Sequence, residues 1–178
     1  MATSTPTSTP LSALSFSRLT KTLKTTLDPI PEASDPSIAL KNTTTSHMIS
    51  ATWTLTSGWS ALSLHPTASV FHYATTYFEG LKCYRSPYDG HVRLFRPLLN
   101  YQRMQKSAAR VALPADFEPE EFLKLITELV ATDTPRWLPK TGTRKFLYIR
   151  PTLIGSGAGL GVDAPKEATL FIILTLIP

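Results

Sequence analysis

Apolar and polar positions alternate in several segments of the chain, and this alternation predicts a β-sheet. The clearest segment is residues 145–155, KFLYIRPTLIG, which is rich in aromatic and β-branched side chains. A period of two places Leu147 and Ile149 on one face of this strand, and Tyr148 and Arg150 on the other. The segment therefore predicts a strand with one apolar face and one face that carries a phenol beside a guanidinium.

Further strands are predicted on both sides of this segment. Residues 81–85 and 92–95 are expected to form a hairpin, because an Asp-Gly pair between them is a strong signal for a tight turn. Residues 168–177 are apolar on both faces, which predicts a central strand. Residues 47–53 and 59–64 are expected to pair with each other around a Ser-Gly turn. Together these segments indicate a sheet that is rich in antiparallel pairs.

Two segments show helical periodicity, and each has a proline at its first position. The first helix is expected to begin at Pro97, and the second to run from residue 119 to 132, followed by a polar loop over 133–143. The apolar positions predicted to face the core are Leu98, Tyr101, Met104, Ala108 and Val111 in the first helix and Phe122, Leu125, Ile126 and Leu129 in the second. We therefore expect an α+β fold, an antiparallel-rich sheet with two main helices.

The first 40 residues are rich in Ser, Thr and Pro and lack regular periodicity, which predicts an irregular arm before a single domain over 41–178. Arg18, Lys21 and Lys24 lie in a Ser/Thr background with no acidic residue before Asp28, a composition found in organellar transit peptides. The apolar positions are sparse for an amphipathic helix. We therefore expect a disordered or draped arm and a cytoplasmic protein, with mitochondrial import as the alternative.

Composition excludes several classes of function. The chain has 178 residues, one cysteine (Cys83) and a formal net charge of +5. The apolar run 170–177 is far shorter than the ~20 residues of a membrane helix, and no second metal ligand lies at a suitable spacing from His47. The glycine-rich stretch 155–161 lacks the register of a nucleotide-binding loop. We therefore expect no metal site and no membrane span. Because the basic residues are spread along the chain, we also expect no nucleic acid as a partner.

Two sets of basic residues are candidates for binding an anion. Tyr148 and Arg150 share a strand face, where a guanidinium fork fits a carboxylate; the alternative is a solvated strand end. Arg103, Lys106 and Arg110 form a basic stripe on the first helix, and such a stripe is often only a solvated surface. The residues alone leave both alternatives open.

Several linked motifs resemble one family of enzymes. The motifs are HY at 72–73, FEGLKCYR at 78–85, RLFRPLLNYQRM at 93–104, LYIRP at 147–151 and LGV at 160–162. In this order and at these separations they are similar to the branched-chain amino acid aminotransferases, fold-type-IV enzymes that depend on pyridoxal 5'-phosphate. The resemblance covers approximately residues 47–178 and implies the small domain of that fold.

The resemblance also implies roles for individual residues. Arg103 would bind the phosphate of the cofactor, and Tyr148 and Arg150 would orient the carboxylates of the amino acid or 2-oxo acid. Phe78 would help to form the wall of the side-chain pocket. Tyr73 and Val162 would reach into the pocket of a neighbouring subunit, so the resemblance implies a dimer.

The resemblance places the lysine that forms the Schiff base, together with the large domain, beyond Pro178. No lysine of this sequence matches that position, so we expect no catalytic residue in this chain and little activity from it alone. The implied activity is exchange of an amino group between a branched-chain or related amino acid and 2-oxoglutarate. The alternative is a non-catalytic dimerising module that pairs with a full-length paralogue; a basic nucleic-acid-binding domain is a third hypothesis.

The chain departs from the family pattern near residue 45. The family usually carries Phe-Thr-Asp-His-Met there, whereas this chain has Thr44 and Ser46 in place of the aromatic and the acid. The change removes an apolar wall from the implied pocket and predicts a relaxed or altered substrate preference. We therefore consider a role in a specialised-metabolite or toxin pathway as a hypothesis.

Overall fold

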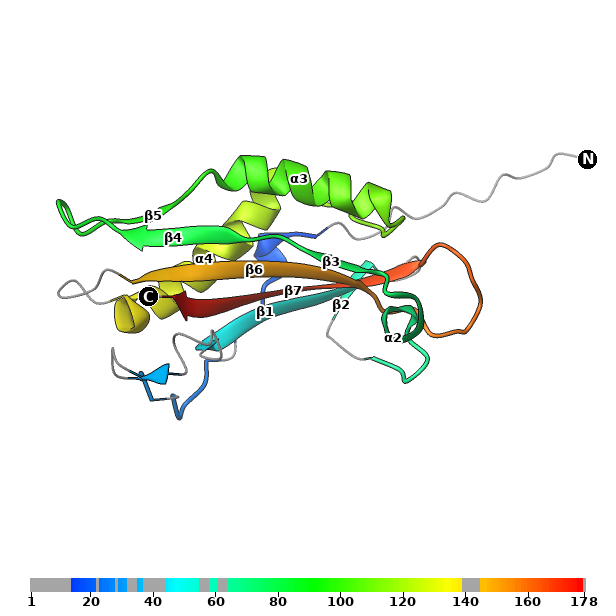
Figure 1. Cartoon of the computed structure of the whole chain (residues 1–178), viewed down its shortest axis with the longest axis horizontal. Helices are drawn as coiled ribbons and strands as arrows, with labels where there is room; N and C mark the ends of the chain where they lie inside the picture. The colour runs from blue at the N-terminus through cyan, green and yellow to red at the C-terminus, as the bar shows by residue number, and fades with distance from the viewer. Residues whose placement is uncertain are drawn as a thin grey trace, which may run out of the picture.

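One antiparallel sheet organises the protein. The computed structural model describes residues 14–21, 23–27, 29–31, 35–36, 44–54, 58–60, 64–138 and 145–177. Seven strands form the sheet, which has the order β2-β1-β7-β6-β4-β5 with β3 also paired to β6. The strands are β1 (Thr44–Thr54), β2 (Gly58–Ser60), β3 (Thr76–Phe78), β4 (Leu81–Arg85), β5 (Val92–Leu94), β6 (Phe146–Gly155) and β7 (Glu167–Ile177). Figure 1 shows β6, β7 and β1 as long neighbouring strands at the centre.

The predicted strands are confirmed with changed ends. β4 and β5 form the expected hairpin, in which Cys83 pairs with Leu94. β7 lies between β1 and β6, as its apolar residues on both faces predicted. β1 begins earlier than expected, and β2 ends at Ser60, while residues 61–63 lie outside the described part.

Two helices cover one face of the sheet. α3 (Pro97–Arg110) and α4 (Pro119–Trp137) each begin with proline, as predicted. Met104 of α3 and Phe122 of α4 are fully buried in the same core cluster as Leu81, Leu147 and Ile149 of the sheet. The alternation of β6 therefore buries the Leu147 face against helices, as predicted from its period of two.

The opposite face of the sheet carries Phe78, Lys82, Tyr84, Tyr148 and Arg150, and we call it the open face. Phe78 and Tyr84 are 56% and 41% exposed. Lys82 pairs with Tyr148 in register across β4 and β6, and its ammonium group lies 4.9 Å from the ring centroid of Phe146. Aromatic and basic side chains therefore alternate over this face.

Two predictions for the helices are wrong. α4 continues to Trp137, so residues 133–137 are helical and not a loop. The helix continues past Pro135 because its end packs in the core, where Trp137 and Leu138 are buried. The Arg85 guanidinium also donates to the carbonyl oxygens of Leu138 and Thr134. Leu98, in the first turn of α3, is 48% exposed and is not a core residue.

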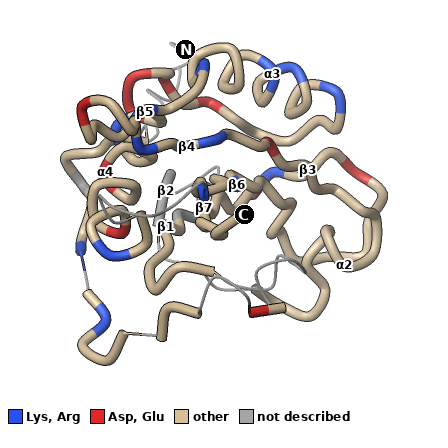
Figure 2. The backbone as a smooth tube through the Cα atoms, turned by 60° about the vertical axis from the view of Figure 1, so that its left-hand side comes forward, with Lys and Arg blue, Asp and Glu red and all other residues tan. Residues whose placement is uncertain are grey.

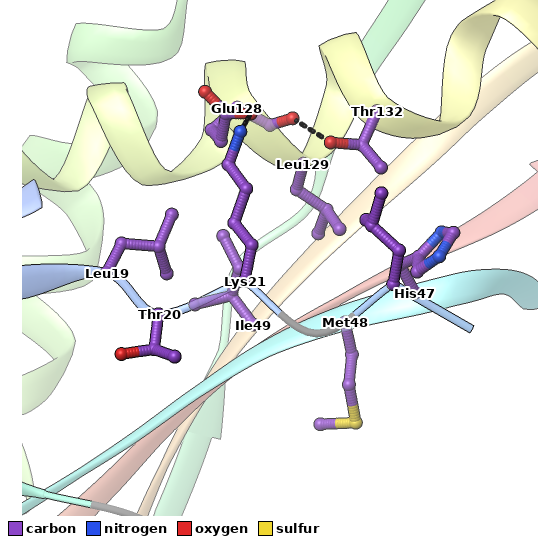
Figure 3. Close-up of a pocket in the computed structure, with 10 residues that line it drawn as sticks. Leu19, Thr20, Lys21, His47, Met48, Ile49, Glu128, Leu129 and Thr132 are labelled. Carbon is purple, nitrogen blue, oxygen red and sulfur yellow. Dashed lines mark hydrogen bonds and ion pairs between the residues drawn. The ribbon is translucent and has the colours of Figure 1, made fainter. Parts of the chain in front are cut away.

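The described part of the N-terminal arm packs on α4. It contains a short 3-10 helix, η1 (Phe16–Arg18), within otherwise irregular backbone. However, Leu14 is buried, the backbone N–H of Phe16 donates to the Glu121 carboxylate, and Lys21 forms an ion pair with Glu128. The arm is therefore draped over this helix. Figure 3 shows Lys21 reaching towards Glu128 across a small pocket between the arm, β1 and α4.

Basic side chains are spread over several elements of the structure. Figure 2 shows Lys and Arg distributed over α3, the strands and the arm. Among the described helices, none has the length and apolar character needed to span a bilayer.

Candidate functional site

A proline in β6 creates an irregular point in the sheet. β3 and β4 are two parts of one edge along β6: Phe78 pairs with Thr152, and Leu81 pairs with Ile149. Between them, Glu79 lies opposite Pro151 and donates its backbone N–H to the Pro151 carbonyl at 3.0 Å. Because proline has no N–H, it returns no hydrogen bond, and the regular pairing is interrupted. The candidate site is built around this interruption.

Arg103 is held beside this point by a buried carboxylate. Its Nε donates to Glu79 Oε1 at 3.1 Å, and its Nη2 donates to Glu79 Oε2 at 2.6 Å. Nη2 also donates to Asn100 Oδ1, one turn earlier in α3. The Arg103 side chain is 60% exposed, whereas that of Glu79 is only 9% exposed. The hydrogen bonds to Glu79 raise the pKa of the Arg103 guanidinium above its usual value, so the group stays charged.

Tyr148 and Arg150 lie together on the open face. The Arg150 guanidinium carbon is 4.4 Å from the ring centroid of Phe78 and 5.1 Å from that of Tyr148. Arg150 Nη2 lies 3.4 Å from the Tyr148 hydroxyl oxygen, which it faces as a donor. These cation–π contacts hold the guanidinium between two rings while Arg150 remains exposed.

Gly80 lets Tyr148 lie against the edge strand. A Cβ on residue 80 would come within 2.8 Å of ring carbons of Tyr148, a distance that real side chains do not tolerate. A glycine within an apolar stretch suggests either a turn or a close backbone approach, and the structure shows the close approach.

In the structure, the two predicted arginines contact two consecutive residues, Phe78 and Glu79. Arg150 stacks on Phe78, and Arg103 binds Glu79. Side chains of consecutive strand residues point to opposite faces, so the two guanidinium groups flank the Phe78–Glu79 backbone. Neither Glu79 nor Asn100 was predicted from the sequence, because a single acid before a glycine and an amide in a helix carry no pattern of their own.

Tyr73 and Val162 belong to a separate lobe at one end of the sheet. Tyr73 is the last residue of α2 (Ser69–Tyr73), a short helix that was not predicted from the sequence. Its hydroxyl donates to the Leu160 carbonyl at 2.5 Å. Two backbone hydrogen bonds, from Ser69 N to Gly157 O and from Gly159 N to Thr67 O, also tie the glycine-rich loop to the start of this helix and to the residues before it. The loop therefore serves to support the lobe, and Val162 on it is 87% exposed.

His47 connects β1 to α4 and to the N-terminal arm. Its Nδ1 lies 2.6 Å from Asp133 Oδ1 of α4, and its Nε2 accepts the backbone N–H of Lys24 at 3.2 Å. Because Nε2 accepts, Nδ1 carries the hydrogen and donates to the carboxylate. In the described ranges, no group of three His, Cys, Asp or Glu side chains is arranged to hold a metal ion.

Comparisons with known proteins relate the whole arrangement to one family. No family model matches the chain. The chain is 44% identical over 161 residues to a mitochondrial branched-chain-amino-acid aminotransferase of Saccharomyces cerevisiae, which covers 85% of this chain and 40% of that protein. It is 45% identical over 155 residues to the cytosolic enzyme of Mus musculus, covering 82% of this chain and 39% of that protein.

Solved structures show the same fold. The branched-chain aminotransferase of Thermoproteus uzoniensis with norvaline superposes with a TM-score of 0.51 at 23% identity, over 72% of this chain and 40% of that one. The branched-chain amino acid aminotransferase of Escherichia coli gives a TM-score of 0.50 at 23% identity, over 72% of this chain and 39% of that one. The α+β sheet with two main helices is thus a known architecture.

The identity to the curated relatives extends over most of this chain, although the chain spans only about 40% of their length. With the linked motifs and the shared fold, this establishes that the chain belongs to the branched-chain amino acid aminotransferase family.

Proposed function

We propose that this chain forms the small domain of an aminotransferase, over residues 41–178, that exchanges an amino group between a branched-chain or related amino acid and 2-oxoglutarate. The observation that supports this most is the pair of guanidinium groups at Phe78 and Glu79. Arg103 is a residue of α3, and Arg150 lies on the open face of β6. The phosphate of a cofactor and the carboxylate of a substrate would therefore each have one guanidinium partner.

Arg103 fits the phosphate of pyridoxal 5'-phosphate. It is exposed and charged, and its hydrogen bonds to Glu79 and Asn100 use Nε and Nη2 but not Nη1. Arginine is suited to binding phosphate because its planar guanidinium can direct several N–H donors at the phosphate oxygens. When bound, the cofactor supplies an electron sink for bond breaking at the α-carbon; this chain's part is to hold the phosphate.

Arg150 and Tyr148 would hold the carboxylate of the amino acid or 2-oxo acid. The rings of Phe78 and Tyr148 fix the Arg150 guanidinium, which lowers the entropy cost of binding a carboxylate. Phe78 is exposed beside it and offers an apolar wall to an aliphatic side chain. Such a wall discriminates one methylene by only ~1–3 kcal/mol, so substrate choice should be loose.

The lobe of α2 and the glycine-rich loop would pair two subunits. Its exposed apolar side chains are Phe71, Tyr73, Leu160 and Val162, and we call them the lobe patch. A small apolar patch on a rigid, hydrogen-bonded lobe suits a protein partner. In the proposed dimer, Tyr73 and Val162 reach the neighbouring subunit's site; a full-length paralogue is the alternative partner.

A chimera tests the activity. The chain is joined to the remaining C-terminal part of the yeast mitochondrial relative, and leucine is offered with 2-oxoglutarate and pyridoxal 5'-phosphate. We expect formation of glutamate, lost in an Arg150→Ala chimera and retained in an Arg110→Ala chimera, because Arg110 is an exposed residue at the end of α3. A folded chimera without activity, beside an active yeast enzyme, would count against the proposal and favour a non-catalytic module.

A further inference from the structure

Only some of the N–H groups of the Arg103 guanidinium form hydrogen bonds within the protein. An arginine side chain carries five N–H bonds: one on Nε and two on each terminal nitrogen. Nε and Nη2 donate to the two carboxylate oxygens of Glu79, and Nη2 donates its second hydrogen to Asn100 Oδ1. In the part of the chain that the structure describes, Nη1 has no hydrogen-bond partner, so both of its hydrogens can be donated to a ligand.

The two partners of Arg103 are themselves fixed. Glu79 is 8% exposed; its backbone N–H is bound to Pro151, and its Oε2 also accepts the Gly80 backbone N–H at 3.3 Å. Asn100 is 6% exposed, and its Nδ2 donates to the carbonyl oxygens of Phe95 and Arg96. Because the amide nitrogen is used in this way, the Asn100 oxygen must face Arg103.

The ion pair between Glu79 and Arg103 contributes little to the stability of the fold. Burying a carboxylate costs desolvation free energy, and an ion pair whose cation remains exposed to water offsets only a small part of that cost. Holding a long arginine side chain in one rotamer costs further entropy. The arrangement does, however, fix the direction of one guanidinium edge at the surface, which is the requirement for binding an oxyanion at a set angle.

We infer that Glu79 and Asn100 are positioning residues, which fix Arg103 so that only its Nη1 edge is offered to a phosphate monoester. The inference rests on the proposed function, because that function supplies the phosphate. It specifies that the phosphate is bound from the Nη1 end. The Nε–Nη2 edge, which would otherwise grip two oxygens in parallel, stays on Glu79.

Nitrogen NMR of the intact chain, labelled with ¹⁵N-arginine, tests this directly. If the guanidinium is held, rotation about its Nε–Cζ bond is slow and Arg103 gives separate Nη1 and Nη2 signals. We expect separate signals in the wild type and one averaged signal in Asn100→Ala and Glu79→Gln. Matched changes at exposed positions, Gln102→Ala on α3 and Glu120→Gln on α4, should leave the Arg103 signals separate.

Titration with inorganic phosphate tests the direction of binding. We expect the Nη1 signal to shift, while the Nε and Nη2 signals move by less than their linewidths. Asn100→Ala changes no charge, and it should weaken phosphate binding about threefold to tenfold, since a side chain ordered in advance must now be ordered on binding. Averaged Arg103 signals in the wild type, or equal phosphate shifts at Nη1 and Nη2, would overturn the inference. The wild-type spectra decide this even if a variant fails to fold.

The result is separable from the chimera experiment. An active chimera with a freely rotating Arg103 would leave the proposed function standing and remove the positioning role. A selective Nη1 shift in a chain whose chimera is inactive would do the reverse, leaving an oriented oxyanion site with another use.

Discussion

The phenol ring of Tyr148 lies against the backbone of Gly80, where a Cβ would come within 2.8 Å of its ring carbons. The contact joins the edge strands β3 and β4 to the open face of β6. Gly80 also lies between Glu79, which holds Arg103, and β4, whose Lys82 pairs with Tyr148. Because Gly80 has no side chain, Tyr148 can lie beside Arg150 on the open face while the neighbouring Glu79 binds Arg103.

Gly80→Ala should disturb the site through this contact. The added methyl group must displace the Tyr148 ring or the edge backbone, at a cost of about 1–3 kcal/mol in the free energy of unfolding. Urea denaturation followed by tryptophan fluorescence measures the change. Gly157→Ala is the matched control, since a Cβ there meets nothing closer than 3.6 Å. Equal stability of the two variants would show that Tyr148 is not confined by residue 80.

Arg85→Ala should destabilise the end of α4. The guanidinium of Arg85 donates to the carbonyl oxygens of Leu138, Gly90 and Thr134, at 2.5, 2.6 and 3.4 Å. Removing a charged donor from partly buried carbonyl groups costs about 2 kcal/mol. We expect a lower denaturation midpoint and faster amide exchange in the last turn of this helix.

Arg93→Ala provides the comparison for that variant. Arg93 pairs with Asp89, and both side chains are well exposed, at 56% and 41%. Exposed ion pairs contribute little to stability, so this change should leave the midpoint nearly constant. The prediction for Arg85 would be wrong if the two alanine variants lost equal stability.

Cys83 should make stability fall at high pH. Burial raises the pKa of its thiol from 9.0 to about 12. Between these values the unfolded chain loses the proton and the folded chain keeps it, so the stabilising contribution is complete below pH 9 and is lost as pH rises towards 12. The slope from this group is about 1.4 kcal/mol per pH unit within that window.

Chemical denaturation from pH 8 to 11 measures this slope. Cys83→Ala should show a shallower decline than the wild type, because it lacks the titrating thiol. At pH 8 the native thiol should react with a disulfide reagent only as fast as the protein opens, since Cys83 is 0% exposed. Rapid labelling of the folded chain would contradict its burial.

Val162→Glu should prevent self-association at the lobe patch. A carboxylate at an interface of Phe71, Tyr73 and Leu160 would be desolvated without a partner. We expect a dimer of the wild type in analytical ultracentrifugation and a monomer of this variant. Tyr88→Glu is the control, because Tyr88 is 97% exposed at the tip of the β4–β5 hairpin. A wild type that stays monomeric at every concentration would refute the proposed pairing.

Much of the fold could be predicted from local pattern. The period of two in residues 146–150 set which face of β6 is buried, the Asp-Gly pair set the hairpin, and prolines 97 and 119 set where two helices begin. Each of these depends on neighbours a few residues apart, so the sequence carries the signal directly. The same alternation placed Tyr148 and Arg150 together on the open face.

Contacts between distant parts of the chain decided the rest. Glu79 meets Arg103 across 24 residues, and Arg85 meets Leu138 across 53, at the end of α4. A hydrogen bond at such a separation depends on where whole elements pack, and a single acid or arginine leaves no periodic trace of it. The sequence by itself therefore determined the strands, the turns and the face of β6, whereas only the tertiary structure decided how Arg103 is held.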